Sequence, residues 1–280
     1  MSEPGAVATG FFVGTHPVAT APGSDPLMLL AVDIGNSNIK FGIFDGEQLV
    51  SRFSIPTKSN LSFAGLKTAF DKGVAAPVSA IVACSVVPTA EPGMADFLRG
   101  YLGIEPVFVR NDFDFGLKIN YEPVSSAGTD RLVNSFAASQ QYGVPCIVCS
   151  FGTATTIDVV DKHGTLTGGI IAPGMETMIR ALNQNTARLP VVDIAAPPTV
   201  VGTTTAAAIQ SGIFYGHVSM VEGLIGMIEN EIGDRPKVIA TGGFSALLAR
   251  RTNRIDVVNE NLTFQGLKAI HLKLAYKNLK

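Results

Sequence analysis

Two adjacent residues of opposite charge, Asp130 and Arg131, follow a glycine and a threonine at the expected start of a helix. An acidic side chain at such a place can simply cap the helix N-terminus, but that explanation gives no role to Arg131. A carboxylate can orient or deprotonate a hydroxyl group, and a guanidinium fork can hold an acidic group. The pair therefore predicts group transfer to an alcohol that also carries an acid.

Two glycine turns of similar sequence, Asp33–Asn38 and Ser150–Thr155, each connect apolar strands, and they align without a gap. Glycine permits positive φ and lets backbone N–H groups approach an anion closely. Either turn alone would be an ordinary hairpin, but a repeated unit is typical of two similar half-domains that face each other. We therefore expect both turns to hold phosphate groups in one cleft. With Asp130 in that cleft, the sequence predicts phosphoryl transfer.

The apolar pattern predicts a mixed α/β fold. One further glycine turn, Thr241–Gly243, follows an apolar strand and precedes a helix, which leaves room for a flat nucleotide base or ribose. The expected helices are 62–73, 91–102, 132–138, 175–183, 204–231 and 244–250, and the expected strands are 29–32, 39–44, 80–87, 107–109, 146–149, 156–160 and 238–240.

The composition excludes several classes of protein. The chain has 280 residues, 46% of them hydrophobic, and a net charge of -2, so it can bury a large core. The lack of a Lys/Arg cluster argues against nucleic acid as a partner, and no apolar run is long enough to span a membrane. Residues 1–27 lack a signal-peptide pattern and are expected to form a flexible extension. The three cysteines have no disulfide-framework spacing, so the expected location is the cytoplasm.

Common catalytic motifs are missing from the sequence. There is no P-loop, no dinucleotide-binding glycine motif and no protein-kinase catalytic loop. Cys146 and Cys149 lie three apart in an apolar strand and should point to opposite faces, which favours packed thiols over a redox or metal pair. Acid–base chemistry is therefore expected from carboxylates. No role is assigned to the four scattered histidines, His16, His163, His217 and His271.

Six short motifs stand in order along the chain. They are Asp33-x-Gly35-Asn36-Ser37, Gly128-Thr129-Asp130-Arg131, Gly152-Thr153-Ala154-Thr155-Thr156, Gly168-Gly169-x-x-x-Pro173-Gly174, Asn185-Thr186-Ala187-x-Leu189-Pro190 and Thr241-Gly242-Gly243. Together they resemble type III pantothenate kinase, from Met28 to about Leu267. The resemblance implies the actin-like (ribonuclease H-like) fold of acetate and sugar kinases, with two similar α/β domains around a cleft. We expect the first domain over 28–135 and the second over 136–280.

The same resemblance implies an activity and assigns roles by position. The activity is the ATP-dependent phosphorylation of pantothenate, the first step of coenzyme A synthesis, by a homodimer that uses Mg²⁺. Asp130 becomes the catalytic base, Thr153 the ATP contact of the second loop, and Asp33 a residue near Mg²⁺. The ATP contacts of the first loop become Asp33, Ile34, Gly35, Asn36, Ser37, Asn38, Ile39 and Lys40. The pantothenate contacts become Tyr121, Gly128, Thr129, Asp130, Arg131 and Thr205, with the pantothenate carboxylate on Arg131 and its primary alcohol on Asp130.

Ser150 departs from the resemblance, because relatives usually carry an aspartate there that binds an activating monovalent cation, K⁺ or NH₄⁺. A hydroxyl group is a weaker ligand than a carboxylate for a hard cation. Carbonyl groups and water could hold the cation instead, the protein could work without it, or its activity could be reduced. Ser150 also keeps open a regulatory or accessory homologue with weak or no kinase activity. A third alternative is an actin-like kinase for another acid or sugar.

Overall fold

The first of two mixed sheets occupies the N-terminal part of the chain in a computed structural model that describes residues 28–57, 63–74 and 77–277. Its strand order is β3-β2-β1-β4-β5, with β1, β2 and β3 antiparallel and β4 and β5 parallel to β1. The expected extension 1–27 lies outside the described residues. The elements are β1 (Met28–Ile34), β2 (Asn38–Asp45), β3 (Gln48–Pro56), α1 (Phe63–Gly73), β4 (Val78–Ser85), α2 (Glu91–Leu102) and β5 (Val107–Phe108).

The second sheet repeats this plan. Its order is β11-β10-β7-β8-β9-β6, so β7 corresponds to β1, β8 and β9 to β2 and β3, and β10 and β11 to β4 and β5. The strand directions correspond too, because β7, β8 and β9 are antiparallel and β10 and β11 run parallel to β7. The elements are β6 (Lys118–Ile119), β7 (Cys146–Phe151), β8 (Ala154–Val160), β9 (Thr165–Pro173), α4 (Met175–Gln184), α5 (Thr205–Ile232), β10 (Lys237–Thr241), α6 (Ser245–Ala249) and β11 (Val257–Val258).

The duplication confirms two similar α/β halves, but the gapless alignment of the two glycine turns is wrong by one residue. Ile34 pairs with Ile39 across the first turn, whereas Phe151 pairs with Thr155 across the second. The second turn is shorter because Gly152 N–H bonds to the carbonyl of Ala154, two residues on, while the corresponding bond of the first turn reaches three residues on. Sequence similarity between the turns concealed this difference in length.

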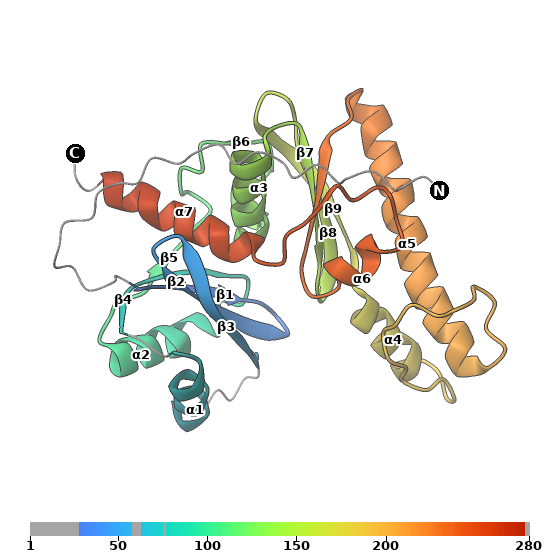
Figure 1. Ribbon diagram of the computed structural model, residues 1–280, viewed down its shortest axis with the longest axis horizontal. Helices are drawn as coiled ribbons and strands as arrows, with labels where there is room; N and C mark the ends of the chain where they lie inside the picture. The colour runs from blue at the N-terminus through green and yellow to red at the C-terminus, as the bar shows by residue number, and fades with distance from the viewer. Residues whose placement is uncertain (1–27, 58–62, 75–76, 278–280) are drawn as a thin grey trace, which may run out of the picture.

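Two helices, α3 (Thr129–Tyr142) and α7 (Leu262–Lys277), lie together between the sheets (Figure 1). They share one buried cluster with residues of β1, β4, β7 and β10. The remaining face of each sheet has a core of its own, covered by α1 and α2 on the first sheet and by α4, α5 and α6 on the second. The expected domain boundary at 135/136 falls inside α3, and α7 packs on both α3 and β1. The division into two domains at that point stays a prediction.

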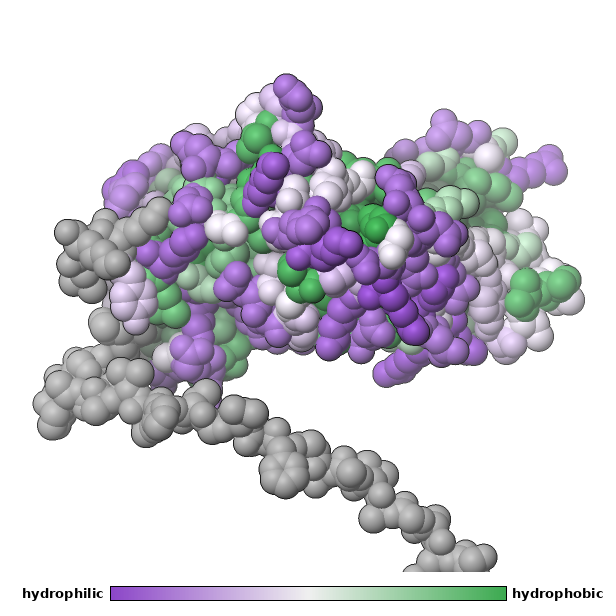
Figure 2. Space-filling view, turned by 90° about the horizontal axis from the view of Figure 1, so that it is seen from above, coloured by the Kyte–Doolittle hydropathy of each residue, from purple (hydrophilic) through white to green (hydrophobic). Residues whose placement is uncertain are grey.

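Most expected helices and strands are present, including the uninterrupted α5, but no element had been expected over the ranges of α7, β3, β6, β9 and β11. Cys146 lies in the central cluster and Cys149 in the cluster under α5, so the two thiols do point to opposite faces. Burial raises the pKa of each to about 12, which keeps both protonated. Within the described ranges, no helix combines the length and apolar character needed to cross a membrane. On the face in Figure 2, hydrophobic residues form small groups among hydrophilic ones.

Candidate active site

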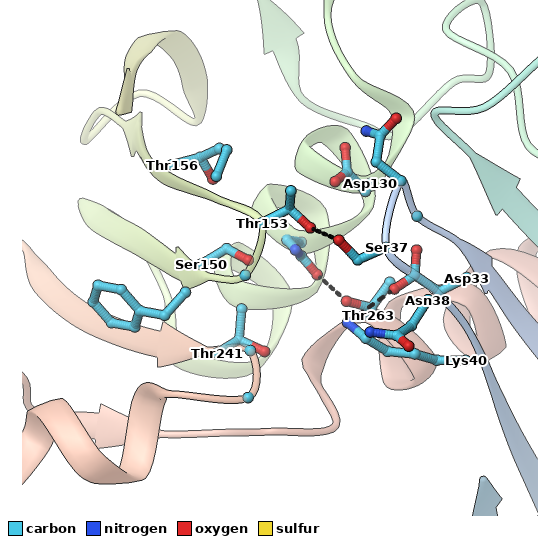
Figure 3. A pocket seen from close by; sticks show the side chains of 18 of the residues that line it. Asp33, Ser37, Asn38, Lys40, Asp130, Ser150, Thr153, Thr156, Thr241 and Thr263 are labelled. Atoms are coloured by element: carbon cyan, nitrogen blue, oxygen red, sulfur yellow. Dashed lines mark hydrogen bonds and ion pairs between the residues drawn. The ribbon is translucent and has the colours of Figure 1, made fainter. Parts of the chain in front are cut away.

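A cavity of about 310 Å³ lies where the two glycine turns face each other. β1 and β7 both end at this cavity, and α3 begins beside it (Figure 3). Its lining combines charged groups with hydroxyl groups and bare backbone, which is the mixture expected for a phosphate-containing ligand. The lining includes Asp33, Gly35, Asn36, Ser37, Asn38, Lys40, Asp130, Asn134, Ser150, Gly152, Thr153, Thr156, Glu176, Thr241, Gly242, Gly243 and Glu260.

The first turn is held by two hydrogen bonds at Gly35. Gly35 N–H donates to the carbonyl of Asn38 at 3.1 Å, and the Thr57 hydroxyl donates to the carbonyl of Gly35 at 2.7 Å. Asp33 is buried at the end of β1, with its Oδ2 atom 3.4 Å from Lys40 Nζ. Both charged groups therefore stand at the cavity wall on a fixed backbone.

Ile34 and Ile39 belong to the first loop in sequence but not to the wall of the cavity. Both side chains are fully buried in the core under α1 and α2. Strand alternation explains this placement, because Asp33 and Lys40 face the cavity and their neighbours must face the opposite side. Any contact of these two residues with a ligand would be through their backbone.

The second turn is held in place by hydrogen bonds to the start of α4 and to the first turn. The carbonyl of Thr153 accepts hydrogen bonds from Gly174 N–H at 3.0 Å and from the Thr177 hydroxyl at 2.7 Å. A Cβ at Gly174 would lie 2.1 Å from the carbonyl oxygen of Gly152, so only glycine allows α4 to approach the turn this closely. Across the cavity, the Thr153 hydroxyl is 2.7 Å from that of Ser37, and the two turns touch (Figure 3).

Asp130 projects into the cavity from the first turn of α3. Burial, and then the nearby Asp33 carboxylate, raises the pKa of Asp130 to about 6. A carboxylate with this pKa is ionised at neutral pH and is a stronger base than an ordinary aspartate. Its Oδ1 accepts the backbone N–H of Arg131 at 2.8 Å, and it approaches Gly128 so closely that a Cβ there would be 2.6 Å from Oδ1. Gly128 therefore makes room for the Asp130 side chain.

Arg131 points away from Asp130, into the protein. It is 6% exposed and forms an ion pair with Asp158 of β8, which is 2% exposed. Arg131 Nε donates to Asp158 Oδ1 at 2.9 Å, and Nη1 donates to the Tyr121 hydroxyl at 3.0 Å. A Cβ at Gly169 would lie 2.7 Å from Arg131 Nη2, so glycine is needed beside the pair. The guanidinium is fixed before any substrate arrives.

Asp158 is a residue that the sequence interpretation missed. It stands in a strand with buried residues on either side. A charged residue in such a strand requires a partner, and this was the signal that could have identified it. The partner itself could not be read from the sequence, because Arg131 and Asp158 are 27 residues apart.

Of the expected pantothenate contacts, Asp130 lines the cavity, and Tyr121, Gly128, Thr129, Arg131 and Thr205 do not. Thr205 comes from a separate element. It begins α5, is exposed, and does not line the cavity. A second hollow of about 440 Å³ adjoins the first, since Glu176 and Phe244 line both. The glycine turn after β10 lines the first cavity, and Phe244, which follows it, lines both hollows. The expected role of this turn beside a nucleotide stays a prediction.

Comparison with known proteins decides the family. The family model described as type III pantothenate kinase matches residues 29–227. The chain belongs to the type III pantothenate kinase family. A type III pantothenate kinase of Acidiphilium cryptum (strain JF-5) is 39% identical over 252 residues, covering 88% of this chain and 95% of the relative. Another, of Paramagnetospirillum magneticum (strain ATCC 700264 / AMB-1), is 40% identical over 257 residues, covering 87% and 96%.

Solved structures support an actin-like kinase fold for this member of the family. A candidate 2-dehydro-3-deoxygalactonokinase of Sinorhizobium meliloti has a TM-score of 0.53 and 15% identity, covering 88% of this chain and 96% of that one. A candidate Baf family transcriptional activator of Campylobacter jejuni has the same TM-score of 0.53 and 21% identity, covering 88% and 99%. At these identities the likeness extends to the fold alone.

Replacing Asp158 by asparagine should destabilise the protein by about 3–5 kcal/mol, because it leaves the buried Arg131 guanidinium without a countercharge. Urea unfolding measures this loss. The control is Asp96→Asn, which removes an exposed partner of Arg99 and should cost less than about 1 kcal/mol. Equal losses in the two variants would contradict the importance of the buried pair.

Proposed function

We propose that this protein transfers the γ-phosphoryl group of ATP to the primary alcohol of pantothenate. The observation that carries the proposal is the meeting of both glycine turns and a carboxylate of raised pKa in one cavity, in a chain of this family. Phosphoryl transfer depends mainly on positioning and on neutralising charge. The product would be 4'-phosphopantothenate, from which coenzyme A is built.

The nucleotide phosphates would lie between the two turns. Backbone N–H groups of both turns, the Lys40 ammonium and the Thr153 hydroxyl are the donors at this place. The base and ribose would extend past Gly242 and Gly243 towards the adjoining 440 Å³ hollow. A Cβ at Gly243 would meet nothing within 4 Å, so space is open on that side, whereas a Cβ at Gly242 would lie 2.5 Å from the carbonyl oxygen of Phe151.

Mg²⁺ fits the same end of the cavity. Its preferred ligands are carboxylate and phosphate oxygens together with water, and the Asp33 carboxylate is available at the wall. Asp33 would hold the ion directly or through water, and the ion would supply neutralisation of charge on the transferring phosphoryl group.

The acceptor would place its alcohol on Asp130 in the cavity and its carboxylate on the remaining donors of Arg131, beside Tyr121. Asp130 is the proposed general base for the pantothenate alcohol, and Arg131 with Tyr121 is the proposed site for its carboxylate. Asp158 and Tyr121 leave some of the five guanidinium N–H donors of Arg131 for a substrate, and Tyr121 can donate its own hydroxyl proton onward. Gly128 and Thr129 would position this segment, because the Thr129 hydroxyl donates to the carbonyl of Ser85 at 2.8 Å.

Asp130→Asn should lower kcat by about 10²- to 10⁴-fold, since an amide cannot accept the alcohol proton. Formation of ADP with pantothenate and with a panel of other acids and sugars measures the effect and identifies the acceptor. Asp96→Asn, an exposed substitution of the same kind, should retain the parent rate. Equal rates in parent and Asp130→Asn would remove Asp130 from the mechanism. Absence of turnover in the folded parent would reject the kinase itself.

The pH dependence of the parent should follow Asp130. The base works only when ionised, so kcat/KM should be level above the pKa of about 6 and fall towards tenfold per pH unit below it. An ordinary aspartate would sustain the rate down to about pH 4. Steady-state kinetics with Mg²⁺ in excess, which keeps the nucleotide in one form, gives the profile. A level profile down to pH 5 would contradict Asp130 as the base.

At Ser150 the residues do not fit a carboxylate-ligated monovalent cation. Ser150 pairs with Thr156 on β8 and with Thr241 on β10, so a row of neutral hydroxyl side chains replaces the expected charge. The carboxylates that line the cavity come from other elements: Asp33, Asp130, Glu176 and Glu260. We therefore propose that the reaction here does not require K⁺ or NH₄⁺.

Exchanging K⁺ for tetramethylammonium should change the parent rate by less than about twofold, because no charged ligand for K⁺ is lost. Ser150→Asp should create a dependence of at least about fivefold, since a carboxylate binds a hard cation more strongly than a hydroxyl group does. Ser150→Ala is the neutral control and should resemble the parent. If the parent loses its activity without K⁺, the reaction requires the ion, and backbone carbonyls and water must suffice to bind it.

A homodimer in the cytoplasm is the proposed state, as expected for the family. The outward face of α5 would allow close approach of a second copy, because it carries exposed small residues at helical spacing. These are Ala208, Gly212, Gly216, Ser219 and Gly223.

A further inference from the structure

A histidine for which the sequence suggested no role lies directly behind the second phosphate turn. His217, in the middle of α5, is 1% exposed, and its Nε2 atom is 2.8 Å from the hydroxyl oxygen of Thr155. Thr155 is also 1% exposed. Neither side chain lines the cavity, so the pair can affect a ligand only through the turn.

Thr155 and His217 meet at the base of the turn. Thr155 pairs with Phe151 across β7 and β8, and between them stand only Gly152, Thr153 and Ala154. The imidazole also contacts the Phe151 ring edge-on, with centroids 6.1 Å apart at 68°. One side chain of α5 therefore touches both residues that close the turn.

The turn is supported from two directions. α4 holds the carbonyl of Thr153 through Gly174 and Thr177, and α5 holds the closing pair through His217. Phosphate recognition by backbone N–H groups requires such support, because a turn that moves loses the alignment of its donors.

The chemistry of His217 fits a permanent hydrogen bond. Burial lowers its pKa, which favours the neutral ring. Nδ1 is buried without a hydrogen-bond partner among the described residues, and an unpaired nitrogen lone pair is better tolerated than an unpaired N–H. With the ring proton on Nε2, the ring donates to the Thr155 hydroxyl oxygen and only an unprotonated Nδ1 is left unpaired on the ring.

We propose that His217 is a positioning residue of the second phosphate turn, which fixes Thr153 and the adjoining N–H groups for the nucleotide through its hydrogen bond to Thr155. The inference rests on the proposed function, because it assumes that ATP phosphates bind at this turn. It extends the nucleotide site to a helix that does not touch the cavity at this point.

Two single variants and their double test the hydrogen bond. His217→Phe keeps a ring against Phe151 but removes the donor, and Thr155→Val keeps the shape but removes the hydroxyl group. Each should raise KM for ATP about five- to tenfold and change KM for pantothenate by less than about twofold. The double variant should be no worse than either single one, because both remove the same interaction.

His217→Gln supplies the conservative rescue, since its amide can place an N–H near the position of Nε2. It should recover most of the ATP affinity, while His271→Phe, the same substitution at a half-buried histidine of α7, should leave both KM values unchanged. Losses that add in the double variant, equal changes in both KM values, or no rescue by glutamine would each overturn the proposal.

Binding of MgATP, measured by calorimetry on the same variants, separates this inference from the proposed function. A parent that binds MgATP without phosphorylating pantothenate would reject the kinase while His217 is still tested by the dissociation constants. A parent that does not bind MgATP would overturn both.

Discussion

The ion pair between Arg131 and Asp158 fixes the start of α3, which carries Asp130, to the second sheet, and the arrangement of the cavity depends on it. On the other side of Asp130, Thr129 bonds to the end of β4 in the first sheet. Of these three consecutive residues, Thr129 attaches to the first sheet, Asp130 is the proposed base, and Arg131 attaches to the second sheet. Asp130 is held where the two halves of the protein meet, which is also where the two glycine turns meet.

The duplicated halves have diverged at the positions that matter for charge. Asp33, next to the last residue of β1, places a carboxylate beside Lys40, whereas Ser150 at the same place in β7 has a neutral hydroxyl group. The second turn is also one residue shorter and is supported by two helices. Within the proposed function, this asymmetry gives the two turns different roles. The first turn would interact with the metal ion and the charged phosphate groups, and the second would hold the nucleotide in place.

Local signals made the centre of the site predictable from the sequence. Glycine turns at the ends of apolar strands, and a carboxylate at a helix start, correctly brought Asp33, Thr153 and Asp130 to one cavity. Contacts between distant segments could not be predicted from the sequence. Asp158 lies 27 residues from Arg131, and His217 lies 62 residues from Thr155. Helix α7 was missed because it is buried against both halves and has only weak amphipathic character.

The buried ion pair is energetically costly, so its main contribution is to be sought in something other than stability. Removing two charges from water costs several kcal/mol per ion, and apolar residues of similar volume often stabilise a protein as well or better. Stability alone therefore gives little reason to keep Arg131 and Asp158. The orientation of Arg131 is a better reason. Asp158 and the Tyr121 hydroxyl hold the planar guanidinium in one orientation, and a guanidinium that is already fixed loses less entropy on binding a carboxylate than a free side chain would. The same contacts anchor the first turn of α3, which also carries Asp130 into the cavity.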